Sequence, residues 1–166
     1  MTARSLVLLR HAKADSPPGC ADRDRPLSVR GHADAQAAGA WLAARHVPEL
    51  VLCSPTKRTR QTWHAVSTRL PAEASPVVRY DRRLYLGEPS ELLDLVREVA
   101  EPVTSVLMIG HNPSLSQLAF ELDPAGGLDS DGLRTCGLTV HAVSGRWPDC
   151  GPRQAPVTAS HTARGT

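Results

Sequence analysis

Short apolar runs recur along this chain, separated by longer segments that mix apolar and polar residues. Continuous runs at residues 6–9, 50–53 and 106–109 have the length typical of strands buried on both faces of a sheet. Weaker runs at residues 77–80 and 138–143 predict two further strands. The hydrophobic pattern therefore predicts strands spread over most of the chain.

Signals for helix starts lie between these predicted strands. Ser28 is expected to cap one helix, and Ser54-Pro55 and Asn112-Pro113 each place a capping residue before a proline. The helices are expected at about residues 28–46, 54–70, 89–100 and 112–122. This alternation predicts an α/β fold, a three-layer sandwich in which a mostly parallel central sheet carries helices on both faces.

Composition and charge narrow the class of protein. Hydrophobic residues make up 41% and charged residues 22% of the 166 residues, as in an ordinary globular domain. A formal charge of +2 is too small to imply a nucleic-acid partner. No apolar stretch approaches the ~20 residues that span a bilayer, so we expect no membrane partner.

The four cysteines show no spacing typical of a zinc site. The four cysteines are Cys20, Cys53, Cys136 and Cys150. If they are free thiols, they favour a cytoplasmic location.

Basic and imidazole side chains follow three of the predicted strands. Arg10-His11 ends the first, Arg58 follows the strand at 50–53, and His111-Asn112 ends the strand at 106–109. Because open α/β sheets build their sites at the carboxyl ends of strands, we expect these side chains to converge. Arginine suits phosphate oxygens, helix N-termini attract anions, and a neutral imidazole can attack phosphorus. The sequence therefore predicts a pocket for a phosphoryl group.

Four segments in this order resemble the histidine phosphatase superfamily, the phosphoglycerate mutase-like group, and most closely its SixA-type phosphohistidine phosphatases. They are Arg10-His11-Ala12, residues 25–31 (RPLSVRG), residues 54–62 (SPTKRTRQT) and Gly110-His111-Asn112-Pro113. The resemblance covers roughly residues 4 to 143. We therefore expect a histidine phosphatase domain at 1–143 and an irregular tail, rich in Pro, Gly, Ser and Thr, at 144–166.

The resemblance implies a role for each matching residue. His11 would be the nucleophile that becomes phosphorylated, and Arg10, Arg58 and His111 would bind the phosphoryl oxygens. Arg25 would add a further phosphate-binding arginine, and Asn112 is a phosphate-binding candidate beside His111. Water would then hydrolyse the phosphohistidine. The family needs neither a metal nor another cofactor.

Two features depart from the superfamily pattern. Ala12 stands where the superfamily usually has glycine, and alanine disfavours a positive φ. The general acid of larger relatives has no clear match, although Asp81 and Glu88 lie in the corresponding segment and are candidates. A phosphoramidate leaves more easily than an alcohol, so the lack of a clear acid favours an N–P substrate.

The expected function is a cytoplasmic phosphatase that dephosphorylates phosphohistidine in a protein. Few segments remain to form a lid, which favours a protein substrate and disfavours a mutase. One alternative is a small-molecule phosphomonoesterase acting on a small phosphate ester. Another is a non-catalytic phosphate-binding module. A metallohydrolase would need a carboxylate–histidine cluster, and the sequence contains none with suitable spacing.

Overall fold

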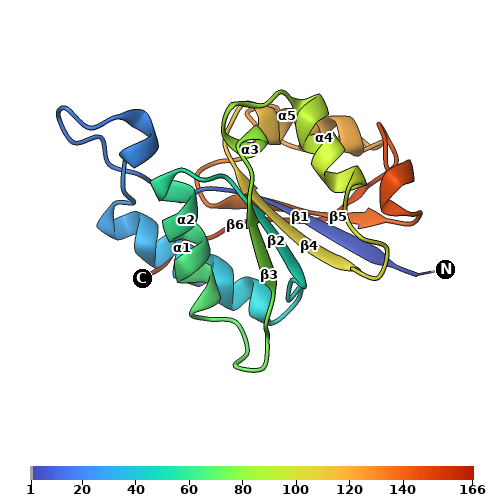
Figure 1. The fold of residues 1–166 in the computed structure, drawn as a ribbon, viewed down its shortest axis with the longest axis horizontal. Coiled ribbons are helices and arrows are strands. Elements are labelled where there is room, and N and C mark those ends of the chain that lie inside the picture. The colour runs from blue at the N-terminus through green and yellow to red at the C-terminus, as the bar shows by residue number, and fades with distance from the viewer. Residues whose placement is uncertain (1) are drawn as a thin grey trace.

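The computed structural model describes residues 2–166, which form one six-stranded sheet with helices on both faces (Figure 1). The strand order is β3-β2-β4-β1-β5-β6. Strands β1 to β4 run parallel to one another, whereas β5 is antiparallel to β1 and β6 is antiparallel to β5. The strands are β1 (Arg4–Arg10), β2 (Leu50–Cys53), β3 (Val77–Tyr80), β4 (Ser105–Gly110), β5 (Gly137–Val143) and β6 (Val157–Thr162). The α/β sandwich with a mostly parallel sheet is confirmed.

Helices occupy both sides of the sheet. One side carries α1 (Val29–Ala43) and α2 (Lys57–Ser67), which pack against each other. The other side carries α3 (Arg83–Leu86), α4 (Pro89–Arg97) and α5 (Ser114–Leu122). Two short 3-10 helices, η1 (Asp22–Asp24) and η2 (Trp147–Asp149), lie in connecting segments.

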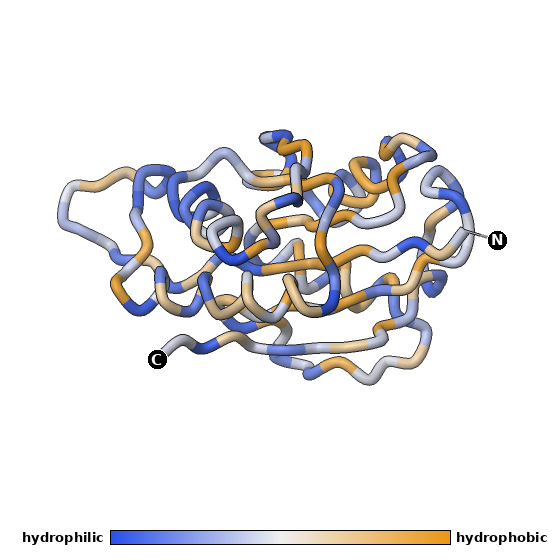
Figure 2. Tube along the Cα trace, turned by 90° about the horizontal axis from the view of Figure 1, so that it is seen from below, coloured by the Kyte–Doolittle hydropathy of each residue, from blue (hydrophilic) through white to orange (hydrophobic). Residues whose placement is uncertain are grey.

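The core has two halves, one on each face of the sheet, because successive strand residues point to opposite faces. Leu6 and Leu8 pack with α4 and α5, whereas Val7 and Leu9 pack with α1 and α2. All four side chains are almost fully buried, as the continuous apolar run predicts. In Figure 2 the hydrophobic stretches include the central strands, whereas many turns of the outer helices and loops are hydrophilic.

The parallel strands β1, β4 and β2 place their C-terminal ends side by side at one end of the sheet. Arg10 is level with Gly110 in the register of β1 and β4, and Cys53 is level with Ile109 in that of β2 and β4. The residues that follow these strands are therefore neighbours. This register is what brings His11 and His111 together.

The start of α1 holds the loop that leaves the first strand. Ser28 caps the helix, because its hydroxyl accepts a hydrogen bond from the Gly31 amide at 2.9 Å, and it also donates to the Lys13 carbonyl at 3.2 Å. A Cβ at Gly31 would collide with that same carbonyl. Gly31 is thus needed for close approach of the loop, although glycine weakens a helix start.

Several predicted helix boundaries differ from the structure. Helix α2 begins at Lys57 with Thr56 as its N-cap, instead of at Ser54-Pro55. The Ser54 hydroxyl instead accepts a hydrogen bond from His111. Helices α1, α2 and α4 each end three residues before their expected ends, and neither η1 nor α3 was expected. One-turn elements such as these carry too few residues for a periodic pattern.

The expectation of an irregular tail from residue 144 is wrong for much of that segment. Strand β6 pairs with β5, and Trp147 in η2 is fully buried with its indole N–H donating to the Val103 carbonyl at 2.7 Å. The β6 sequence VTASHT has one large aliphatic residue, so hydrophobicity does not mark it as a strand. Backbone hydrogen bonds to β5, rather than buried apolar side chains, hold this strand in the sheet. Within residues 2–166, no helix has both the length and the apolar character needed to cross a membrane.

Candidate active site

A pocket of about 380 Å³ lies at the edge where β1 and β4 end. Its side chains include four cations and two imidazoles, and no carboxylate is among its lining residues within the described chain. Such a lining favours an anion with spread charge, such as a phosphoryl group. The lining residues are Arg10, His11, Lys13, Ala14, Arg25, Arg58, His111, Asn112 and Thr135.

His11 is held in one orientation and one tautomer. Its Nδ1 lies 2.7 Å from the Ala12 carbonyl oxygen, so Nδ1 carries the proton and donates it. The lone pair of neutral His11 is therefore on Nε2. The Ala12 amide donates to the Thr62 hydroxyl of α2 at 3.1 Å, which anchors this turn to the helix. His11 is 8% exposed, so Nε2 is the atom available to attack.

The surroundings of His11 keep its imidazole neutral. Burial is the largest effect, and the charges of Arg58, Arg10 and Arg25 add to it, so that the pKa of His11 falls to about 4. The hydrogen bond to Ala12 opposes this shift only in part. At neutral pH the ring is thus uncharged, as a nitrogen nucleophile must be.

His111 lies beside His11, with ring centroids 5.2 Å apart. Arg58 Nη2 donates to His111 Nδ1 at 3.3 Å, and His111 Nε2 donates to the Ser54 hydroxyl at 2.8 Å. Burial, followed by the neighbouring His11 and Arg58, lowers the pKa of His111 to about 3. Both imidazoles are therefore neutral at neutral pH in the free protein.

Two arginines of the pocket come from different elements, β1 and α2. Arg58 from α2 is 5% exposed and Arg10 ends β1. The Nε atoms of both are buried without a hydrogen-bond partner among the described residues. Arg10 Nη1 donates to the Leu133 carbonyl at 3.1 Å, and this hydrogen bond orients the Arg10 guanidinium. Each guanidinium therefore keeps a donor that the described protein atoms do not use.

Asn112 and Arg25 complete the predicted set in the same pocket. Asn112 Nδ2 donates to the Leu133 carbonyl at 2.8 Å, so its amide shares an acceptor with Arg10. Arg25 Nε donates to the Asp15 carbonyl at 3.0 Å. Arg25 thus lines the pocket from the loop. Asn112 instead binds the Leu133 carbonyl, the same group that accepts a hydrogen bond from Arg10.

Asp22 and Tyr85 contact the site, and neither was predicted. Asp22 Oδ2 accepts from Arg58 Nη2 at 3.1 Å and from the Tyr85 hydroxyl at 2.6 Å. The hydrogen bond from Tyr85, with those from Arg58, holds the pKa of Asp22 at about 2. The Tyr85 ring lies 5.4 Å from that of His111. Asp22 also pairs with Arg25 at 3.4 Å. No motif in the sequence marks Asp22 or Tyr85 as part of this site.

The two candidate acids, Asp81 and Glu88, lie outside the lining of this pocket. The Asp81 carboxylate accepts hydrogen bonds from Arg83, including one from Nη2 at 2.9 Å, and these bonds lower its pKa. Glu88 is exposed at the start of α4, where its amide donates to Glu91 at 3.1 Å. The structure therefore brings neither carboxylate to the histidines.

Ala12 fits the turn at this site without strain. Among the described residues, only Cys136 and Arg153 are non-glycine residues with a positive φ. The departure from the usual Arg-His-Gly thus leaves the placement of His11 intact.

Comparison with known proteins supplies the decisive observation. A family model described as the histidine phosphatase superfamily (branch 1) matches residues 6–84. An uncharacterised protein of Mycobacterium tuberculosis is 38% identical over 165 residues, covering 94% of this chain and all of that protein. The solved structure of a protein assigned as phosphohistidine phosphatase SixA from Nakamurella multipartitia is 32% identical, covers 98% of both chains and has a TM-score of 0.85.

The chain belongs to the histidine phosphatase superfamily. A second structure, of a protein assigned as SixA from Agrobacterium tumefaciens, is 27% identical with a TM-score of 0.77 and covers 95% of this chain and 97% of that one. The protein is thus a phosphatase of the phosphoglycerate mutase-like fold. The resemblance that the four sequence segments indicated is confirmed.

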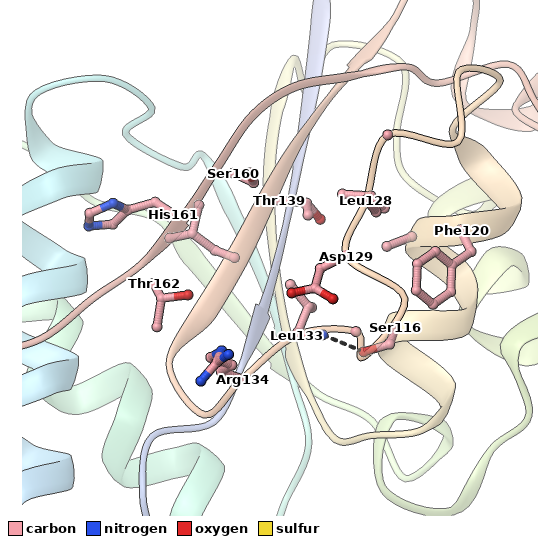
Figure 3. A pocket seen from close by; sticks show the side chains of 14 residues that line it. Ser116, Phe120, Leu128, Asp129, Leu133, Arg134, Thr139, Ser160, His161 and Thr162 are labelled. Atoms are coloured by element: carbon pink, nitrogen blue, oxygen red, sulfur yellow. Dashed lines mark hydrogen bonds between the residues drawn. The ribbon is translucent and has the colours of Figure 1, made fainter.

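A second pocket of this histidine phosphatase, of about 260 Å³, lies between α5, the segment 127–134 and the strands β5 and β6 (Figure 3). Ser116 accepts a hydrogen bond from the Leu133 amide at 2.9 Å and donates to Asn112 Oδ1 at 2.6 Å. The Leu133 carbonyl in turn accepts from Arg10. Leu133 therefore lines the second pocket and, through its carbonyl, also supports Arg10 of the first pocket. Within residues 2–166 there is no cluster of three or more histidine, cysteine or acidic residues suited to a metal.

The pKa of His11 gives this phosphatase a defined response to pH. The pKa of His11 is about 4, so its imidazole is neutral above that pH. The ionisation of His11 should therefore leave kcat/KM unchanged between pH 7 and pH 5, and kcat/KM should fall about tenfold per pH unit below pH 4. Because His111 already has a pKa near 3, its ionisation in the free enzyme should cause no loss at alkaline pH. An NMR titration of the imidazole carbons, with His11→Gln to assign the signal, measures the pKa directly. A midpoint near 6.5 would contradict this assignment.

Proposed function

We propose that this phosphatase acts through a phosphohistidine formed on His11 and that its substrate is phosphohistidine in a protein. The observation that supports the first part most strongly is the tautomer of His11. Nδ1 is bound to the Ala12 carbonyl, which leaves the Nε2 lone pair inside a pocket lined by cations. The sequence of bond changes follows from that geometry.

In the first step, His11 Nε2 forms a bond to phosphorus while the bond from phosphorus to the leaving group breaks. Arg10, Arg58 and Arg25 surround the site and neutralise the charge on the phosphoryl oxygens. In the second step, the oxygen of a water molecule bonds to phosphorus and the P–Nε2 bond breaks. Inorganic phosphate and neutral His11 are the products, with the proton of water passed to phosphate or solvent.

His111 takes part by donating a hydrogen bond to the phosphoryl group. In the free protein its Nε2 proton is bound to Ser54 and its Nδ1 accepts from Arg58. A bound phosphoryl dianion adds negative charge beside Nδ1, which favours the neutral tautomer with the proton on Nδ1, while Nε2 accepts a hydrogen bond from the Ser54 hydroxyl. His111 would then bind an oxygen as a donor, while Asn112 positions Arg10 through the Leu133 carbonyl.

The substrate class follows from the missing acid. Among the described residues no carboxylate lines the pocket, and Asp22, which contacts Arg58, has a pKa of about 2 and is ionised. An alkoxide leaving group needs a proton from an acid. A phosphohistidine can carry a proton on its other ring nitrogen, so its imidazole leaves as a neutral group. The site thus favours cleavage of an N–P bond.

The cysteines support a reducing compartment for this activity. All four are free, and Cys53, Cys136 and Cys150 are buried. Burial raises the pKa of Cys53 and Cys136 to about 12, so these thiols stay protonated and unreactive. We place the enzyme in the cytoplasm, where such thiols remain reduced.

Two peptides of one sequence test the substrate class, one with a central phosphohistidine and one with phosphoserine in its place. We expect kcat/KM for the phosphohistidine peptide to be higher by about 100-fold or more, since general acid catalysis is worth about that factor to the ester. The matched flanks make the bond to phosphorus the main variable. A preference for phosphoserine, or for a small aryl phosphate, would overturn the proposal in favour of a phosphomonoesterase. Binding of both peptides without turnover would indicate a phosphate-binding module.

A further inference from the structure

A second cationic site lies on the outer surface of α1 and α2, beside the active site. It is a groove of about 280 Å³. Lys57, Arg60, Gln61 and His64 recur on one face of α2 at helical spacing, and His32 of α1 faces them. We call these five residues the α1/α2 groove. Its lining contains two full cations and two histidines but no carboxylate.

The two cations of the groove have no side-chain partner among the residues that the structure describes. Lys57 and Arg60 are exposed and make no ion pair or side-chain hydrogen bond within residues 2–166. Elsewhere on the surface, Arg83 and Arg146 are paired with Glu98 and Glu101. The charge of the groove is thus free to interact with an external anion.

The groove adjoins the active site through two short connections. Lys57 directly precedes Arg58 on α2, and Gln61 Oε1 accepts a hydrogen bond from the Leu27 amide at 2.8 Å. Leu27 ends the loop that carries Lys13 and Arg25 to the pocket. Figure 1 shows this loop projecting beyond the ends of α1 and α2. Cations of the phosphoryl pocket and of the groove therefore lie on either side of this loop, whose Asp15, Asp22 and Asp24 offset its own positive charges.

The charge is concentrated on this side of the molecule. Helix α2 carries Lys57, Arg58 and Arg60 and no carboxylate. On the opposite layer, residues 88–101 contain five carboxylates and one arginine. The formal charge of +2 for the whole chain hides this separation. An acidic partner would therefore approach with its negative surface toward the α1/α2 side.

We propose that the α1/α2 groove docks an acidic segment of the phosphorylated protein, next to the phosphohistidine that enters the pocket. The proposal rests on the function proposed above and names the partner chemistry that the surface selects. Because the charges are exposed, they should act on encounter and KM more than on kcat. Salt should weaken the effect, since the Debye length falls to about 3 Å at 1 M.

Two phosphohistidine peptides test the docking site, one with a run of glutamates beside the phosphohistidine and one with glutamines in their place. We expect the wild-type enzyme to prefer the glutamate peptide by about tenfold in kcat/KM at low salt. Lys57→Gln/Arg60→Gln should abolish this preference, as should 1 M salt. Hydrolysis of a small aryl phosphate should be unchanged in that variant, because neither residue lines the catalytic pocket.

The matched control is Arg69→Gln/Arg79→Gln, which removes the same charge outside the groove. It should retain the preference for glutamate. If it lost the preference to the same extent, or if the groove variant kept it, the docking site would be refuted and net charge or another surface would be responsible. Equal rates for both peptides in the wild type would refute it as well.

Binding of an unphosphorylated, fluorescent glutamate peptide separates this inference from the proposed function. We expect its affinity to fall about tenfold in Lys57→Gln/Arg60→Gln and to be unchanged in the control variant. If neither phosphohistidine peptide were hydrolysed while this difference remained, the groove would stand and the proposed substrate would be wrong. If the three proteins bound the peptide alike, the groove would be wrong whatever the substrate.

Discussion

Replacement of His11 by asparagine should abolish turnover, with a loss in kcat/KM of at least about 10³-fold, the scale on which removal of a nucleophile is measured. The physical reason is the position of one lone pair. His11 Nδ1 is bound to the Ala12 carbonyl, so in the proposed mechanism Nε2 is the atom that forms the bond to phosphorus. Asparagine can keep a polar contact at this position, but its amide is no substitute for the imidazole nucleophile. The measurement is steady-state hydrolysis of an aryl phosphate and of a phosphohistidine peptide.

Covalent labelling shows whether the loss has the expected cause. The wild-type protein should take up phosphate from a radiolabelled phosphoramidate in an acid-labile, alkali-stable form, and His11→Asn should take up none. His46→Asn is the matched control, because His46 lies just beyond the C-terminal end of α1, beside Trp41. Label that persisted in His11→Asn would mean that another residue is the nucleophile. Thermal unfolding of both variants would separate loss of chemistry from loss of fold.

The strands of the sheet could be predicted from the sequence to the extent that their side chains are buried. The run at residues 6–9 is apolar without interruption because Leu6 and Val7 contribute to different halves of the core, one on each face. Strand β6 lies at the edge of the sheet and alternates half-buried with exposed residues. Its position depends on pairing with β5, a long-range contact that leaves little trace in composition.

Site residues that directly follow buried strands could be predicted from the sequence, whereas those on short elements could not. Arg10 and His111 stand directly at the ends of strands, so the register of a parallel sheet was enough to bring them together. Asp22 and Tyr85 come from η1 and α3, elements of three and four residues that approach the site only in the folded chain. Asp81 is in the expected segment, but Arg83 two residues later takes up its carboxylate. The ion pair of Asp81 with Arg83 thus prevents the general-acid role that the position of Asp81 in the sequence suggested.

These contacts give the site a consistent electrostatic arrangement. The cations proposed to bind a phosphoryl group also add to burial in keeping the two histidines neutral, since Arg58 lowers the pKa of both His11 and His111. Asp22 is half-exposed and partly compensates Arg58 in the free protein. A bound phosphoryl group would compete with Asp22 for the Arg58 guanidinium. Arg58 is thus the residue on which binding and nucleophile ionisation both depend.

Replacement of Arg58 by alanine should therefore cost about 3 kcal/mol or more of transition-state stabilisation, a loss of 10²- to 10³-fold in kcat/KM, as for a donor in an oxyanion hole. Arg58→Lys should recover only part of the activity, because a single ammonium cannot reproduce contacts from Nη1 and Nη2 to Asp22 and from Nη2 to His111. Arg60→Ala is the matched control on the same helix. It removes an exposed cation and should leave hydrolysis of an aryl phosphate near the wild-type rate.

The pKa of His11 distinguishes a direct role of Arg58 from a structural one. Because Arg58 is among the charges that lower this pKa, Arg58→Ala should raise it from about 4 toward 6.5, and the acid limb of kcat/KM should move to higher pH in the same sense. Arg60→Ala should leave the NMR titration of His11 unchanged. If Arg58→Ala retained near-normal turnover, the phosphoryl group would have to bind elsewhere. If turnover fell while the pKa of His11 stayed near 4, Arg58 would act on the phosphoryl oxygens alone and burial would account for the neutral nucleophile.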